Sequence, residues 1–137
     1  MAGYSGTPLA KKLGIKENHR LAFVNAPKDF LAQLGRLPAT TKIVERLTKP
    51  LDLVLLFVES EKSLVQQFPR LANKVASNGM IWIAWPKKSS GVATDLSFDR
   101  VQKIGLQGGL VDVKICAVDD IWSGLKFVYR LKDRPQK

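Results

Sequence analysis

Three stretches of the chain are apolar without the alternation of a half-exposed strand. They span residues 21–26, 51–58 and 80–85, and their few polar positions lie near the ends. An uninterrupted apolar run of this length is typical of a strand that helices cover on both faces of a sheet. We therefore expect three adjacent, parallel and buried strands.

Helical periodicity separates the later strands. Residues 61–77 place their apolar side chains on one helical stripe. Pro69 removes a backbone donor inside that stripe, so the helix is expected to kink or restart there, and to end at Asn78 and Gly79. A further helix is expected over about 95–107, because its apolar residues again follow the helical period.

Two short helices and a weak strand fill the N-terminal half. One helix is expected to begin at Pro8 and to stop at Gly14. Another is expected from Pro27, which suits the first turn of a helix, to Gly35, which suits the position just after one. Residues 42–47 are a weak strand candidate.

The hydrophobic period changes to two after Gly109. Residues 110–118 and 125–131 alternate apolar and polar positions, and residues 119–124 are a short link between them. This is the pattern of an antiparallel hairpin with one wetter face. Together, the elements predict a three-layer α/β sandwich with a mainly parallel sheet and a C-terminal antiparallel hairpin.

The length of 137 residues suits one domain. We expect a single α/β domain over 1–137, with 1–20 as a basic N-terminal segment packed on it and 132–137 as a short tail. The apolar run 53–58 is too short to cross a bilayer. The first residues lack the pattern of a secretory signal, which favours the cytoplasm. A single cysteine also fits that compartment, so we expect a cytoplasmic protein.

The charge is strongly basic. The chain has 22 Lys and Arg residues against 12 Asp and Glu, a net charge of +10, and residues 1–50 carry nine of the basic groups and three of the acidic ones. Such a surface attracts anionic partners, so an anionic small molecule or an acidic protein is favoured, and no membrane partner is expected. Nucleic acid remains an alternative partner, although the basic residues are dispersed and not interleaved with aromatic ones.

The chain carries few groups for metal or nucleophilic chemistry. His19 and Cys116 are its single histidine and single cysteine, and a zinc site needs three or four such ligands, so no metal is expected. Cys116 shares its predicted strand face with Asp112 and Lys114. A lowered thiol pKa is one reading of that placement, and a small strand residue is the better one. We assign no catalytic residue.

Several strings in the chain carry a resemblance to a known family. Between about residues 4 and 131 the chain resembles a bacterial family of small proteins that is classified as a domain of unknown function. The resemblance implies no particular activity. The strings that carry it are Tyr4–Ile15, Asn25–Pro27, Ile81–Lys88, Thr94–Leu96, Gly109–Cys116 and Trp122–Phe127.

The order of the elements is also similar to the later part of a Rossmann-like methyltransferase. Such enzymes hold their cofactor with a glycine-rich turn after the first strand and with an acidic residue that ends the next strand. In this chain the first strand ends in Asn25, Ala26, Pro27 and Lys28, with no glycine, and the acidic residue has no clear counterpart. We therefore expect no cofactor.

The carboxyl ends of the three parallel strands are the expected place for a ligand, because they meet at one edge of an open α/β sheet. An indole beside two ammonium groups and an amide suits an anion with an apolar or aromatic part. The alternative is that the indole caps the core and the two lysines are ordinary loop charges. The candidate binding residues are Asn25, Glu59, Ser60, Trp85, Lys87 and Lys88.

These observations favour a small cytoplasmic α/β binding or regulatory module without catalysis. It would engage an anionic ligand or an acidic partner through the strand-end edge and the basic N-terminal segment. Two alternatives stay open. One is a degenerate methyltransferase-like enzyme that binds a cofactor, and the other is a nucleic-acid-binding protein.

Overall fold

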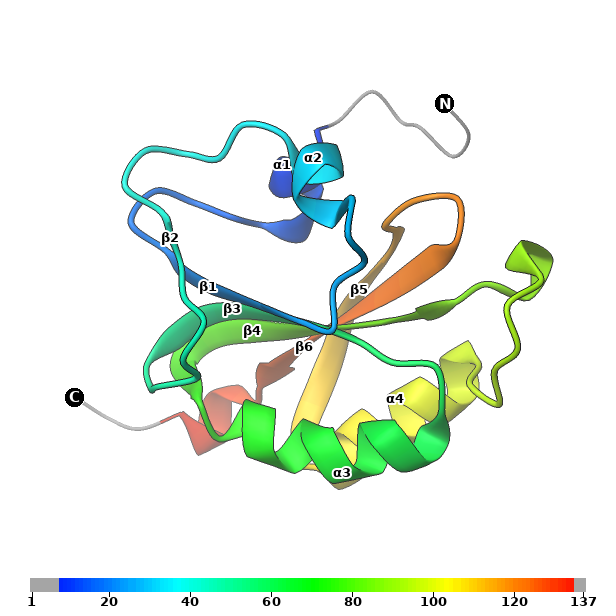
Figure 1. Cartoon of the computed structure of the whole chain (residues 1–137). Helices are drawn as coiled ribbons and strands as arrows, with labels where there is room; N and C mark the ends of the chain where they lie inside the picture. The colour runs from blue at the N-terminus through cyan, green and yellow to red at the C-terminus, as the bar shows by residue number, and fades with distance from the viewer. Residues whose placement is uncertain (1–7, 135–137) are drawn as a thin grey trace.

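A computed structural model describes residues 8–134 of the chain as three layers, a sheet between two layers of helices (Figure 1). Helices α1 and α2 lie above the sheet in this view, and α3 and α4 lie below it. The expectations for residues 1–7 and 135–137 lie outside the described residues. The elements are α1 (Leu9–Leu13), β1 (Arg20–Val24), α2 (Phe30–Leu34), β2 (Lys42–Ile43), β3 (Leu51–Phe57), α3 (Glu61–Ala72), β4 (Val75–Pro86), α4 (Phe98–Gln107), β5 (Leu110–Ala117) and β6 (Trp122–Tyr129).

The sheet has the order β2-β1-β3-β4-β6-β5. Strands β1, β3 and β4 are adjacent and parallel, and the hairpin of β5 and β6 joins β4 in antiparallel pairing. No side chain from Leu53 to Val58 is more than 3% exposed. The structure confirms the predicted three-layer α/β fold, including the three central buried strands and the antiparallel hairpin.

Two apolar cores cover the two faces of the sheet. One packs β-strand side chains against α3 and α4, and the other packs them against α1 and α2. Trp82 in β4 belongs to the second core and is fully buried. Its indole Nε1 donates a hydrogen bond to the carbonyl oxygen of Leu13, 2.9 Å away. A buried indole needs such an acceptor, so this bond fixes the end of α1 on the sheet.

The start of β4 corrects the predicted end of the preceding helix. Helix α3 continues through Pro69 but ends at Ala72, and Val75 already pairs with Leu51 of β3. The prediction that the helix runs to 77 and ends at Asn78 and Gly79 is therefore wrong. Val75 is buried in the sheet core, and a Cβ at Gly79 would lie 2.9 Å from the Leu51 carbonyl oxygen. Glycine permits this close approach of two strands where their register shifts.

The hairpin also departs from the expected pattern. Strand β6 begins at Trp122, inside the predicted link 119–124, because Asp119 Oδ1 accepts hydrogen bonds from the N–H groups of Ile121 and Trp122, each at 2.8 Å, and tightens the turn. In β5 the register shifts between Asp112 and Lys114. The irregularity interrupts the simple alternation over 110–118 that the sequence predicts.

Within residues 8–134, no helix is both long and apolar enough to cross a membrane.

The packing of α4 on β6 gives the first testable prediction. A methyl group at Gly105 would overlap the ring of Phe127, which is fully buried. We expect Gly105→Ala to lower the free energy of unfolding by about 1–3 kcal/mol, although alanine is the better helix former. Gln107→Ala, an exposed change in the same helix, should stay within about 0.5 kcal/mol. Denaturant unfolding measures both, and equal stability of the two variants would contradict the close packing.

Candidate functional site

The connections that leave β1 and β3 diverge at the carboxyl ends of these strands. From β1 the chain crosses one face of the sheet through α2 and returns as β2, next to β1. From β3 it crosses the other face through α3 and returns as β4, which lies on the side of β3 away from β1. Where neighbouring connections separate in this way, an open α/β sheet has a crevice outside the strand ends, and ligands bind there. The carboxyl ends of β1 and β3 are therefore the candidate site.

Asn25 forms the turn at the end of β1. Its φ is +61°, in the left-handed region that most side chains avoid and that glycine and asparagine accept. Its side-chain Nδ2 donates to the carbonyl oxygen of Phe57 at the end of β3, at 3.4 Å. Thus the turn has the backbone conformation of a glycine turn without a glycine, and the amide links the two strand ends.

Glu59 and Ser60 form the turn at the end of β3. Ser60 is the N-cap of α3, and its hydroxyl accepts a hydrogen bond from the N–H of Ser63 at 3.1 Å. The carbonyl oxygen of Glu59 accepts one from the Thr94 hydroxyl at 2.6 Å. The Glu59 side chain is exposed. The backbone of this turn is therefore fixed while its carboxylate faces solvent.

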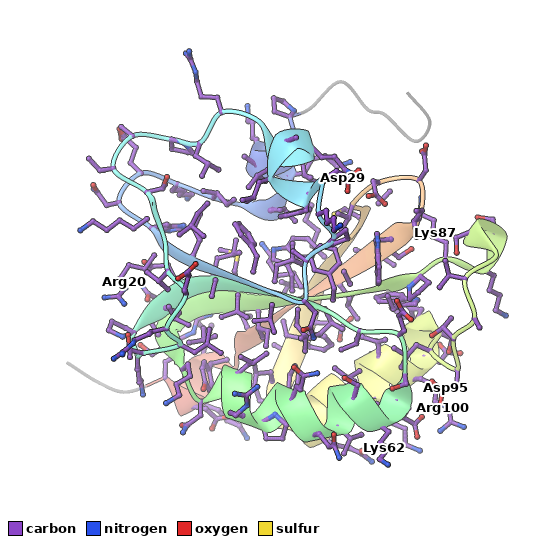
Figure 2. All side chains as sticks on the ribbon, viewed as in Figure 1. Arg20, Asp29, Lys62, Lys87, Asp95 and Arg100 are labelled. Carbon is purple, nitrogen blue, oxygen red and sulfur yellow. The ribbon has the colours of Figure 1, made fainter. Side chains whose placement is uncertain are left out.

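The loop after β4 is tied to the same turn. Asp95 Oδ1 accepts from the N–H of Glu61 at 2.8 Å, and Arg100 forms an ion pair with Glu61 at 3.2 Å. Figure 2 shows Asp95, Arg100 and Lys87 on one side of the molecule, opposite to Arg20. The loops that follow β3 and β4 therefore form one continuous edge.

The remaining predicted site residues belong to β4 and the loop after it. Trp85 is 5% exposed and packs in the core beneath the sheet, on the face opposite to Trp82. Lys87 is half-buried, and its N–H donates to the Ile121 carbonyl oxygen at 2.7 Å, while Lys88 is exposed. The structure thus places Asn25 at the end of β1 and Glu59 and Ser60 after the end of the neighbouring β3, places the two lysines one strand further along, and puts the indole in the core.

Glu45 is a candidate that the sequence alone does not indicate. The N–H of Val44 donates to the Leu21 carbonyl oxygen at 2.8 Å, so the chain after β2 continues beside β1 for one more residue. Glu45 follows directly and is exposed. It is an exposed acidic residue that follows the second strand of the sheet in chain order. The strand predicted over 42–47 covers only Lys42 and Ile43, both exposed, and its pairing with β1 places Glu45 beyond its end.

The single histidine lies in a turn, and the single cysteine lies partly buried in β5. The ring nitrogen Nδ1 of His19 accepts a hydrogen bond from the N–H of Lys16 at 3.2 Å within a turn. Burial raises the pKa of the Cys116 thiol, and nearby lysines oppose this effect only in part. The lowered pKa considered from the sequence is therefore wrong. Among the described residues no cluster of His, Cys, Asp or Glu could hold a metal ion.

No family model matches the chain, and no curated protein matches it. Solved structures do. A SAM-dependent methyltransferase from Aquifex aeolicus matches with 12% identity and a TM-score of 0.61, over 87% of this chain and 86% of that one. Magnesium protoporphyrin IX methyltransferase from Synechocystis PCC 6803 with bound SAM matches with 12% identity and a TM-score of 0.58, over 89% and 74%. Aeropyrum pernix fibrillarin, with natively bound S-adenosyl-L-methionine, matches with 15% identity and a TM-score of 0.55, over 92% and 70%.

These likenesses show that the chain has a methyltransferase-like fold. They agree with the architectural similarity noted in the sequence, while the resemblance to the bacterial small-protein family stays a prediction. They also correct the leading hypothesis of a non-catalytic module for an anionic ligand or acidic partner. Because two of these similar structures are methyltransferases and the third holds S-adenosyl-L-methionine, the methyltransferase-like alternative has the better support.

The position of the two indoles gives a second prediction. Trp82 and Trp85 are both buried, in different cores. We expect Trp82→Ala and Trp85→Ala each to lower the free energy of unfolding by about 3–5 kcal/mol. Lys88→Ala, at an exposed position, should stay within about 0.5 kcal/mol. Denaturant unfolding compares the three variants. A small effect of Trp85→Ala would contradict the core position of its ring and favour a ring that lines the candidate site.

Proposed function

We propose that the protein is a methyltransferase-like enzyme that binds an adenosyl cofactor in the crevice between the ends of β1 and β3. The observation that carries this proposal is the left-handed turn at Asn25, located where the connections of β1 and β3 diverge in a methyltransferase-like fold. In such folds the turn after the first strand approaches the cofactor, and its residues must accept an unusual backbone conformation.

The residues around the crevice fit such a cofactor at two points and depart from the usual pattern at one. Asn25 supplies the turn, and Glu45 supplies a carboxylate after the second strand. Pro27 has no N–H, so this turn offers one backbone donor fewer than a glycine-rich loop does. Affinity must therefore depend more on side chains here than in a protein with three glycines.

Each side chain has a distinct part in the proposal. The Glu45 carboxylate accepts hydrogen bonds from the ribose hydroxyls, as acidic residues at this position of related folds do. Asn25 keeps the ends of β1 and β3 together through its bond to Phe57. The exposed carboxylate of Glu59 attracts the positive charge of the methionine part. When bound, the cofactor supplies an electrophilic methyl group.

The direct test is a titration of the full chain with S-adenosylmethionine and S-adenosylhomocysteine in a calorimeter, with thermal unfolding as a second readout. We expect saturable heat with both ligands and a higher melting temperature in their presence, since a ligand that binds only the folded state stabilises it. The glycine-free turn led us to expect no cofactor. Absence of both signals at millimolar ligand would restore that expectation and end the proposal.

Replacing the candidate ribose partner gives a sharper prediction. Glu45→Gln removes a charged acceptor, so we expect cofactor affinity to fall roughly 10- to 100-fold. Glu17→Gln is the matched control, because Glu17 is also exposed and lies in the turn between α1 and β1. Calorimetry on both variants should show loss of affinity in the first and normal affinity in the second. Similar affinities in the two would remove Glu45 from the site.

The backbone conformation at Asn25 can be tested by two replacements with opposite steric demands. Asn25→Gly should keep the left-handed turn, because glycine adopts a φ of +61° without strain, and should weaken cofactor binding only through loss of the amide bond to Phe57. Asn25→Val should destabilise the fold by about 1–2 kcal/mol and weaken binding, because a β-branched residue avoids this region. Unfolding and calorimetry would measure both. If valine binds the cofactor as well as asparagine does, the turn is not part of the site.

A further inference from the structure

A cluster of lysines surrounds the contact between α1 and the β5–β6 hairpin, away from the strand-end crevice. We call it the lysine cluster, and it consists of Lys12, Lys16, Lys114 and Lys126. Lys114 and Lys126 are directly opposite each other in the ladder of β5 and β6. Side chains directly opposite in a ladder are close neighbours, with Cβ atoms about 5 Å apart, and like charges there destabilise the pair.

The other contacts bring the remaining members to the same place. The Lys114 ammonium group donates to the carbonyl oxygen of Lys12, and the Lys12 ammonium group donates to that of Ala117, both at 3.1 Å. Lys126 Nζ lies 5.9 Å from the centre of the Trp82 ring. Burial lowers the pKa of Lys126, and repulsion from Lys114 and Lys16 lowers it further. The ammonium groups are therefore close enough to repel one another.

In the part of the chain that the structure describes, none of the four lysines forms an ion pair with a carboxylate. Among residues 8–134 the one ion pair joins Arg100 and Glu61, on the other side of the sheet. Two of the lysines donate to carbonyl oxygens, which align them but do not neutralise them. Holding like charges close together lowers the stability of the fold. Proteins accept such unfavourable arrangements mainly at functional sites.

We propose that the lysine cluster is a binding site for a compact phosphate-bearing anion, such as a diphosphate group. Ammonium groups bind phosphate as point charges, and several of them around one spot suit a group with several negative oxygens. The cations converge from one short helix, the turn after it and two paired strand positions. This arrangement fits a compact group better than an extended polyanion, which needs cations along a groove.

Cys116 is a built-in reporter for this site. It lies two residues after Lys114 in β5, and Lys12, Lys114 and Lys126 all lower its thiol pKa against the larger effect of burial. It is the single cysteine of the chain, so a thiol reagent reports on one position. An anion that neutralises the lysines should raise the thiol pKa and decrease the reactive thiolate.

The experiment measures alkylation of Cys116 in the full chain by iodoacetamide, an uncharged reagent, at constant pH, with and without inorganic pyrophosphate. Sodium chloride at the same ionic strength is the control for screening. We expect pyrophosphate to slow alkylation about three- to tenfold in a saturable way, and the matched salt to have a much smaller effect. Equal slowing by both solutions would overturn the proposal, since it would mean screening without a site.

Two double variants locate the effect. Lys114→Gln with Lys126→Gln should abolish the response to pyrophosphate, whereas Lys62→Gln with Lys103→Gln, exposed positions on α3 and α4, should leave it unchanged. Thermal unfolding establishes that both variants fold. A response that persists in the first variant, or disappears in the second, contradicts a local site.

A single-stranded oligonucleotide at equal phosphate concentration distinguishes the two sources of phosphate. Protection of Cys116 by the oligonucleotide without protection by pyrophosphate would overturn the compact-anion proposal in favour of an extended strand. The lysine changes should leave cofactor affinity in the β1–β3 crevice unaltered. Failure of either proposal can therefore be recognised independently of the other.

Discussion

The burial of β3 on both faces is the constraint on which the rest of the structure depends. From Leu53 to Val58 almost no side chain reaches solvent, so an unpaired polar group anywhere in this strand would be costly. Helices must cover both faces, which requires crossovers above and below the sheet. Polar chemistry is consequently confined to the turns at the strand ends and to the outer hairpin, and both candidate sites are found in these places.

The strand ends show how the crossovers produce a site without a recognisable motif. The chain leaves β1 and β3 toward opposite sides once their pairing ends at Val24 and Leu56, and beyond that point the Asn25 amide donates to the Phe57 carbonyl oxygen. Its left-handed backbone performs the steric task of a glycine. A search for a glycine-rich sequence motif misses this turn, because asparagine can adopt the same left-handed backbone conformation as glycine.

The central strands and the hairpin could be predicted because burial on two faces, or on one, leaves a direct pattern of apolar residues. Other features depend on pairing that no local pattern shows. Val75 continues the helical stripe of α3 but joins β4, because tertiary burial opposite Leu51 outweighs periodicity. Glu45 follows a strand of two exposed residues, and the opposition of Lys114 and Lys126 depends on a register shift in β5. Such juxtapositions are properties of the sheet, not of the segments.

Trp82 explains how the fold carries the lysine cluster. One side of β4 places this indole beneath α1, where it donates to the Leu13 carbonyl oxygen, and Lys126 is its neighbour in β6 and lies over its ring. The aromatic face attracts the ammonium group and offsets part of the repulsion from Lys114. The same ring therefore fixes the helix that bears Lys12 and lies beneath the ammonium group of Lys126. A diphosphate bound there would remove the remaining repulsion, so anion binding and the docking of α1 on the sheet must be thermodynamically coupled.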